Sequence, residues 1–294
     1  MVSAPELEVL VRPPGFEPGS PAWQALAPVL WNELRDGFRE FAADRYAPQT
    51  AKGLINYLER FLKEPIQDPV DVLRLFSNLS VGQQHHLNRA LRALFNYLEI
   101  LGWSKTWLDS LRKAIPKDRI GIDLHVPEPG EILESMKRLP GIPLKYRALW
   151  SLCLDSGIRM IEAIRIIGAF SEEKLTAVNG FYRYDIGAFR GSKQAYYAYF
   201  TGSTFEVLNE AAGIGIKEKS ASHYYCKYGL VSPKYLRKFA FDRMIELGVP
   251  ESVADFIEGR VPKRIGAKHY MALRRQADRW YPLYAMYLKK LRAS

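Results

Sequence analysis

A change of hydrophobic period in the second half of the chain is the feature that most constrains the fold. Over most of the sequence, apolar side chains recur at helical spacing, as in the run from Leu87 to Leu98. In residues 181–200, aromatic and apolar side chains alternate with others on both sides of Gly191-Ser192, which is typical of a β-hairpin closed by a tight turn. Helical spacing then returns. The sequence therefore predicts a mainly α fold with one small β-hairpin or sheet.

The helical segments form two groups, separated by a polar stretch that contains proline and glycine. The chain has 294 residues, which is enough for about two domains. We expect an extended Pro- and Gly-rich tail at residues 1–25, a helical domain at 26–115, a linker at 116–127 and a second domain at 128–294.

The charge of the chain indicates a polyanionic partner. Lys and Arg number 42 against 32 Asp and Glu, which gives a net charge of +10. Nucleic acid is the commonest partner of so basic a protein, although charge alone is also compatible with an unrelated role. A polar and basic stripe follows one helical face of the first domain at His85, Arg89, Arg92 and Asn96. A solvated helix face and a surface that lies against DNA phosphates both explain this stripe.

The residue content argues against several other classes of protein. Cys153 and Cys226 have no neighbouring Cys or His at metal-ligand spacing, which disfavours a zinc site and favours a reducing compartment. No apolar run approaches the ~18 residues that a membrane span needs. The N-terminus, with Glu6 and Glu8, lacks the apolar core of a secretory signal. We therefore expect an intracellular, cytoplasmic and nucleoid-associated protein that does not bind a membrane.

Two basic residues of the second domain occupy positions that suit phosphate chemistry. Arg159 follows Gly157, which is expected to end one helix, so Arg159 stands near the N-terminus of the next helix, a setting that favours anions. Lys193 follows the hairpin turn. A lysine there is either exposed and inert or able to donate a proton to a leaving oxygen.

Three more basic residues lie nearer the C-terminus. Lys234 and Arg237 are three apart in a helix that Ser232-Pro233 begins, so they share a face and need solvent or an anion between them. A glycine before Arg260 leaves that residue on a turn, and Tyr270 follows ten positions later. Tyr270 is one of 17 tyrosines, so its position alone indicates no role.

In this order, the five basic residues and Tyr270 resemble the pattern of the tyrosine recombinase (integrase) family. That pattern is a Gly-x-Arg segment, a hairpin lysine, a His-x-x-Arg helix, a basic turn after glycine and then a tyrosine, and this chain matches the order over residues 126–270. Lys234 replaces the usual His, and Arg260 replaces the usual His or Trp. Both replacements resemble archaeal integrases of the fusellovirus and plasmid type. The helical domain at 26–115 resembles the family's core-binding domain.

The resemblance implies a site-specific DNA recombinase that integrates and excises a mobile element of an archaeal virus or plasmid. Tyr270 would attack a DNA phosphate and form a 3′-phosphotyrosyl link. Arg159 and Arg237 would clamp the non-bridging oxygens, Lys193 would protonate the leaving 5′ oxygen, and the two replacing cations would add donors. Because the phosphoester bond is conserved, we expect no cofactor. No Asp or Glu cluster stands at these positions to hold Mg²⁺, so we expect no metal and a site made almost entirely of permanent cations, with His269 as the only nearby titratable base.

The implied partner is double-stranded DNA. The resemblance implies a homotetramer on two DNA sites and a monomer or dimer away from DNA. Candidate DNA-contacting residues outside the active site are His85, Arg89, Arg92, Asn96 and, beside the hairpin turn, Arg190. Two alternatives stay open: a type IB topoisomerase-like relaxase with the same active site, and a non-catalytic architectural DNA-binding protein.

The N-terminal tail carries a separate indication. Its segment Gly15-Phe16-Glu17-Pro18 can be encoded by GGG-TTC-GAA-CCC, which resembles the T arm of a tRNA gene. Archaeal integrases of this type often carry their attachment site, a tRNA 3′ segment, inside their own gene. Residues 12–19 therefore resemble translated attachment-site DNA, and a tRNA gene is the expected target. A Pro- and Gly-rich tail of no significance is the alternative.

The helix after Tyr270 is rich in aromatic residues, among them Trp280, Tyr281 and Tyr284. In the tyrosine recombinase family, a C-terminal segment often packs on a neighbouring protomer. Packing within its own domain explains the pattern equally well.

Overall fold

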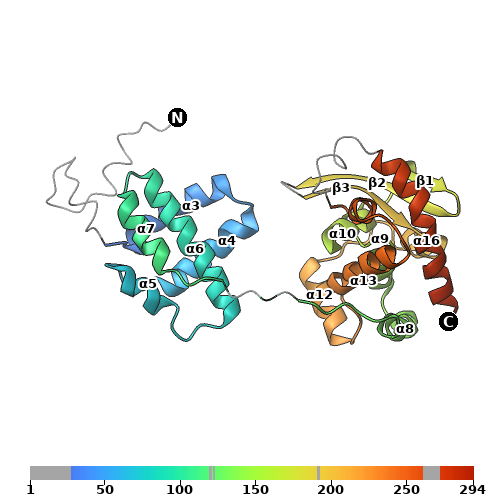
Figure 1. Ribbon diagram of the computed structural model, residues 1–294, viewed down its shortest axis with the longest axis horizontal. Coiled ribbons are helices and arrows are strands. Elements are labelled where there is room, and N and C mark those ends of the chain that lie inside the picture. Colours follow the sequence, from blue (N-terminus) through green and yellow to red (C-terminus); the bar gives the residue numbers. More distant parts are fainter. Residues whose placement is uncertain (1–27, 119–120, 122, 191–192, 261–271) are drawn as a thin grey trace. The chain divides into compact units, whose positions relative to one another are not determined.

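A computed structural model describes residues 28–118, 121, 123–190, 193–260 and 272–294. The chain divides into two units, Met1–Asp123 and Leu124–Ser294, and the division falls inside the predicted linker at 116–127. Figure 1 shows the elements of each unit. The predicted tail at 1–25 and Tyr270 lie outside the described residues. None of the helices in the described ranges is both long and apolar enough to cross a lipid bilayer.

Helices build the described part of the first unit. They are α3 (Trp31–Arg45), α4 (Pro48–Phe61), α5 (Pro69–Leu75), α6 (Val81–Ile100) and α7 (Lys105–Ala114). Helix α6 packs against α3, α4 and α7, because its leucines at helical spacing, Leu87, Leu91 and Leu94, are fully buried. Ser80 begins α6 with a capping box, in which its hydroxyl accepts a hydrogen bond from the Gln83 N–H.

The second unit surrounds one buried helix with other helices and a small sheet. Its elements are α8 (Pro129–Arg138), η1 (Leu139–Gly141), α9 (Leu144–Ser156), α10 (Met160–Gly168), η2 (Glu172–Lys174), β1 (Leu175–Val178), β2 (Phe181–Arg190), β3 (Lys193–Phe200), α11 (Gly202–Glu210), α12 (Glu218–Lys227), α13 (Pro233–Glu246), α14 (Glu251–Ile257) and α16 (Leu273–Ala293). Every side chain of α9 from Ala148 to Ser156 is buried. Helix α9 contacts α10, α11, α13 and β3, so it forms the centre of this unit.

The sheet confirms the predicted hairpin and adds a strand to it. Its order is β1-β2-β3, and both pairings are antiparallel. Asp185 pairs with Tyr197 and Ala188 with Ala195, so two residues of β2 oppose one residue of β3 in a bulge. The short strand β1 was not predicted from the sequence, because its residues, Leu-Thr-Ala-Val, do not alternate between apolar and polar side chains.

The C-terminal helix α16 packs on its own unit. Its buried residues are Ala277, Tyr281, Tyr284, Leu288 and Leu291. The Tyr281 hydroxyl donates to the Asp155 carbonyl at 3.0 Å, and the Tyr284 hydroxyl donates to the Leu154 carbonyl at 2.9 Å. Since both carbonyls belong to the last turn of α9, α16 closes its own domain, which was one of the two alternatives left open by the sequence.

Candidate functional site

A pocket of about 220 Å³ brings together three of the cations singled out in the sequence. Its lining residues are Arg159, Met160, Ser222, Ser232, Pro233, Lys234 and Arg237. The three cations come from the start of α10 and the first two turns of α13. Two arginines and a lysine around one small pocket have the charge and the hydrogen-bond donors that suit a tetrahedral anion such as a phosphate.

The local structure that carries these cations is as predicted. Helix α9 ends at Gly157, which has φ of 61°, and Arg159 is the N-cap residue of α10. A left-handed residue at this point reverses the chain so that α10 begins immediately, and glycine adopts that conformation without strain. Ser232 is the N-cap residue of α13, and Pro233 is its first residue.

Arg237 is held by the ends of two helices. Its Nη1 donates to the Gly157 carbonyl at 2.7 Å and to the Glu258 carbonyl at 2.6 Å. These carbonyls lie just beyond α9 and α14, where the negative ends of the helix dipoles help to stabilise a cation. The Arg237 side chain is only 13% exposed, and this burial lowers its pKa to about 10.

Arg159 also contacts the turn that follows α14. Its Nη1 donates to the Gly259 carbonyl at 2.6 Å. A Cβ at Gly259 would lie 2.7 Å from the Ala195 Cβ, so this turn needs glycine in order to pack against β3. The turn at Glu258 and Gly259 therefore fixes both arginines through backbone carbonyls.

Glu258 is a site residue that the sequence analysis missed. Its fully buried carboxylate places Oε2 3.0 Å from Arg260 Nη2 and 3.6 Å from Arg237 Nη2. Burial raises the pKa of Glu258 to about 7, against the lowering effect of Arg237 and Arg260. The pKa of Glu258 is raised and that of Arg237 is lowered, so burial favours the neutral form of both side chains. The free-energy cost of burying the two charges therefore exceeds their mutual attraction.

The buried carboxylate of Glu258 adds a titratable acid beside Arg237 and Arg260 to the site that was expected to consist almost entirely of permanent cations. The glutamate directly before the Gly-Arg pair was the available signal, but a charge at a helix end is usually solvated. Within the described ranges, no group of three or more His, Cys, Asp and Glu residues is arranged to hold a metal ion.

Arg260 is not among the residues that line the pocket. It pairs with Glu258 and, at 3.6 Å, with Asp255, and its guanidinium lies 5.0 Å from the centre of the Phe241 ring. Its side chain is 40% exposed. The structure thus connects Arg260 to Arg237 through the Glu258 carboxylate.

Of the two remaining predicted catalytic positions, only Lys193 is placed, and only by its backbone. Lys193 is the first residue of β3 and pairs with Arg190, the last residue of β2. Tyr270 lies outside the described residues, between Arg260 and the start of α16.

Most of the polar stripe on α6 contacts other residues of the first unit. His85 Nδ1 lies 3.1 Å from Asp118 Oδ2, and Arg92 Nε donates to Asn88 Oδ1 at 2.7 Å. The Asn96 side chain accepts from Arg112. Arg89 is exposed on the same helix. These contacts show why the stripe is polar, and its binding to DNA stays a prediction.

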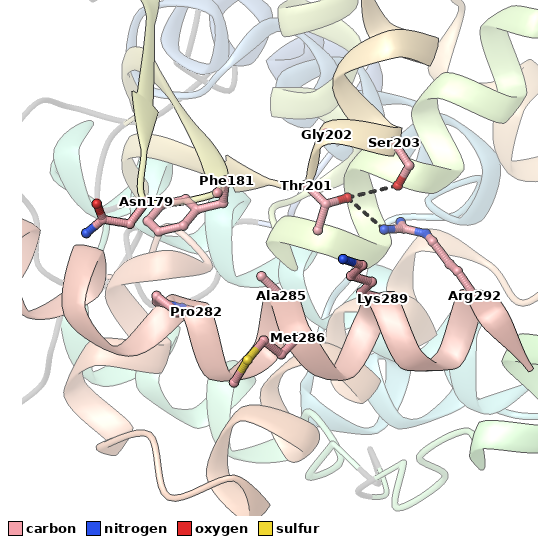
Figure 2. A pocket seen from close by; sticks show the side chains of 11 residues that line it. Asn179, Phe181, Thr201, Gly202, Ser203, Pro282, Ala285, Met286, Lys289 and Arg292 are labelled. Atoms are coloured by element: carbon pink, nitrogen blue, oxygen red, sulfur yellow. Dashed lines mark hydrogen bonds between the residues drawn. The ribbon is translucent and has the colours of Figure 1, made fainter.

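A second pocket, of about 560 Å³, lies between α16, the β1–β2 turn and the start of α11. Figure 2 shows Phe181, Pro282, Ala285, Met286 and Lys289 among its lining side chains. On one side of it, Arg292 Nη1 donates to Thr201 Oγ1 at 2.7 Å (Figure 2). None of the cations predicted to bind phosphate lines this pocket.

Comparisons with known proteins identify the family and the fold. Residues 124–287 match a family model described as archaeal phage integrase. Among solved structures, the chain is similar to a lambda integrase(75–356) dimer bound to a COC′ core site, with a TM-score of 0.59, 11% identity, and coverage of 80% of this chain and 96% of that chain. The chain is also similar to a second structure of a lambda integrase dimer bound to a COC′ core site. The TM-score is 0.58 and the identity 12%, and the match covers 90% of this chain and 83% of that chain. No protein in a search of curated proteins matches the chain.

At these identities the lambda integrase structures show the fold alone. The match to the family model shows the family, since the matched segment is over half of the chain and contains all the predicted catalytic positions in order. It contains Arg159, Lys193, Lys234, Arg237, Arg260 and Tyr270. The chain therefore belongs to the archaeal phage integrase family, as its resemblance to the tyrosine recombinases predicted.

Proposed function

We propose that this integrase cleaves and rejoins double-stranded DNA through a 3′-phosphotyrosyl intermediate, and that it integrates and excises a mobile element at a tRNA gene. The observation that carries the proposal is the pocket in which Arg159, Lys234 and Arg237 meet. A scissile phosphate in this pocket would place its non-bridging oxygens against guanidinium groups that backbone carbonyls already hold in place.

The chemistry is a transesterification in which bonds and protons balance. The Tyr270 oxygen loses its phenolic proton to solvent and attacks phosphorus, the bond from phosphorus to the 5′ oxygen breaks, and Lys193 gives that oxygen its proton. In the second step, the 5′ hydroxyl of a partner strand returns its proton to Lys193 and attacks the phosphotyrosine, and the released tyrosine takes a proton from solvent. Arg159 and Arg237 stabilise the negative charge that grows on the phosphate in both steps.

A suicide substrate with a nick beside the cleavage point tests this function. After cleavage the short strand diffuses away, so the protein stays covalently attached to DNA and runs more slowly on a denaturing gel. We expect this adduct for the wild type and none for Tyr270→Phe. An equal adduct from Tyr270→Phe would refute the assignment of the nucleophile.

The target is tested with DNA that encodes residues 12–19, compared with a scrambled copy. Recombinant product from the encoding DNA alone supports the tRNA-gene target. Equal product from both DNAs contradicts that target and leaves the cleavage chemistry intact. Relaxation of a supercoiled plasmid without recombinants would favour the type IB topoisomerase-like alternative.

The assembly is a further part of the proposal. We expect a homotetramer when two DNA sites are joined and a monomer or dimer without DNA, because strand exchange joins two duplexes. Light scattering of the protein with and without its substrate measures both masses. A measured mass that corresponds to one protomer bound to the joined DNA would contradict the tetramer.

A further inference from the structure

The side chain of Glu258 is tightly enclosed, although a charged residue at a helix end is usually exposed to solvent. Its side chain is fully buried, and a Cβ at Gly157 would lie 2.7 Å from its Oε1 and 2.9 Å from its Cγ. The glycine of the Gly-x-Arg segment therefore leaves room for this carboxylate as well as reversing the chain. Nothing in the transesterification above uses Glu258.

Two groups of Glu258 face the same guanidinium. Its backbone carbonyl accepts from Arg237 Nη1 at 2.6 Å, and its Oε2 lies 3.6 Å from Arg237 Nη2. A planar guanidinium contacted at both terminal nitrogens has little freedom to rotate. The remaining contact, from Nη1 to the Gly157 carbonyl at 2.7 Å, completes this cradle.

We infer that Glu258 is a positioning residue of the phosphate pocket: it fixes the Arg237 guanidinium, and the charge on its carboxylate sets how strongly that guanidinium binds a phosphate. The inference rests on the proposed function, because the phosphate occupant of the pocket is part of that proposal. A phosphate and an ionised Glu258 carboxylate are both anions beside Arg237, so each weakens the hold of Arg237 on the other.

The groups around Glu258 define when it carries its charge. Arg237 from α13, Arg260 and Arg159 face it as cations, and Asp255 from α14 faces it as an anion. Tyr284 from α16 is also close enough to sense its charge. Burial holds the Glu258 pKa at about 7, so the carboxylate is half ionised near neutrality. An anion bound at Arg237 raises this pKa further, and the site then takes up a proton on binding.

Sulfate is a suitable probe, because it is tetrahedral like phosphate and does not titrate near neutral pH. Its affinity is read from the rise of the melting temperature of the full chain with sulfate concentration. For the wild type we expect the affinity to fall about three- to tenfold from pH 6 to pH 8, since one linked proton changes affinity by at most about tenfold per pH unit.

Two variants separate the charge of Glu258 from other effects. Glu258→Gln keeps the shape but not the charge, so its sulfate affinity should be the same at both pH values and close to that of the wild type at pH 6. Glu246→Gln is the matched control, because Glu246 is an exposed glutamate on α13 that pairs with Arg243. It should keep the pH dependence of the wild type.

The outcomes distinguish this inference from the function on which it rests. Arg237→Ala and, independently, Lys234→Ala should each weaken sulfate binding, because both side chains line the pocket. If neither does, the phosphate pocket and the proposed function fail together with the inference. If they do, but the wild type binds sulfate equally at pH 6 and pH 8, only the role of Glu258 is overturned. Retention of the pH dependence by Glu258→Gln overturns that role as well.

Discussion

Replacement of Arg292 by methionine should loosen α16 from the second unit. Arg292 Nη2 donates to Asp155, and Arg292 Nη1 donates to Thr201 Oγ1 at 2.7 Å. The fully buried Asp155 carboxylate also accepts from the Thr201 N–H at 2.9 Å and from its hydroxyl at 2.7 Å. Methionine keeps the apolar stem of the arginine but leaves this carboxylate without its cation.

The size of the effect follows from the burial of the pair. Loss of one partner of a buried ion pair costs ~3–5 kcal/mol, and the partial exposure of Arg292, at 22%, argues for the lower end. Opening of α16 lets water reach Asp155, so the free energy of that opening should fall by about 3 kcal/mol. Because ~1.4 kcal/mol is a factor of ten, amide hydrogen exchange in α16 should be more than about a hundredfold faster.

Hydrogen exchange read by mass spectrometry follows the α16 peptides of the full chain directly. Lys290→Met is the matched control, because Lys290 is an exposed cation on the same helix, and its exchange should stay near that of the wild type. Asp155→Asn added to Arg292→Met should restore part of the protection, since it removes the uncompensated charge. Exchange in Arg292→Met within about threefold of the wild type, or no recovery in the double variant, would refute the reasoning.

Three further outcomes are expected. Gly157→Ala should destabilise the second unit by about 2–4 kcal/mol in urea unfolding, because a steric clash with Glu258 adds to the ~1–2 kcal/mol cost of a left-handed backbone. Gly248→Ala is the control, since Gly248 has φ of 85° and no atom near the new Cβ, so only the backbone cost should appear. Equal losses of stability in the two variants would contradict the clash. Glu258→Gln should be more stable than the wild type by up to about 3 kcal/mol at pH 8, since the pKa of Glu258 is about 7 in the folded protein and near its ordinary value of 4.5 in the unfolded chain. This difference in stability should shrink as the pH falls from 7 to 4.5, and a constant difference over this range would contradict the prediction. Tyr281→Phe should cost about 1–2 kcal/mol, measured by the same unfolding, because the Asp155 carbonyl loses its hydroxyl donor, and an unchanged stability would show that this hydrogen bond contributes nothing.

Local pattern was sufficient where a feature depends on neighbours in the chain. The positions of Gly157 and Arg159 at a helix end and a helix start follow from cap preferences, and so does the start of α13 at Ser232-Pro233. The hairpin follows from a period of two in its strands. The order of the basic residues then pointed to the integrase family before any contact between them was known.

Only the tertiary structure decided which charged side chains are buried, because burial results from packing between residues that are far apart in the sequence. Glu258 looks like an ordinary charge at a helix end, and only its enclosure by Gly157 and Arg237 turns it into a buried partner of the site. Arg260 likewise has the expected place in the sequence, yet it is not among the residues that line the pocket and it pairs with Glu258 and Asp255. The sequence by itself thus predicted a set of cations, and packing determined that Arg159, Lys234 and Arg237 line one pocket. The physical reason is that the charge of a residue follows from its type, whereas its burial depends on residues far away in the chain.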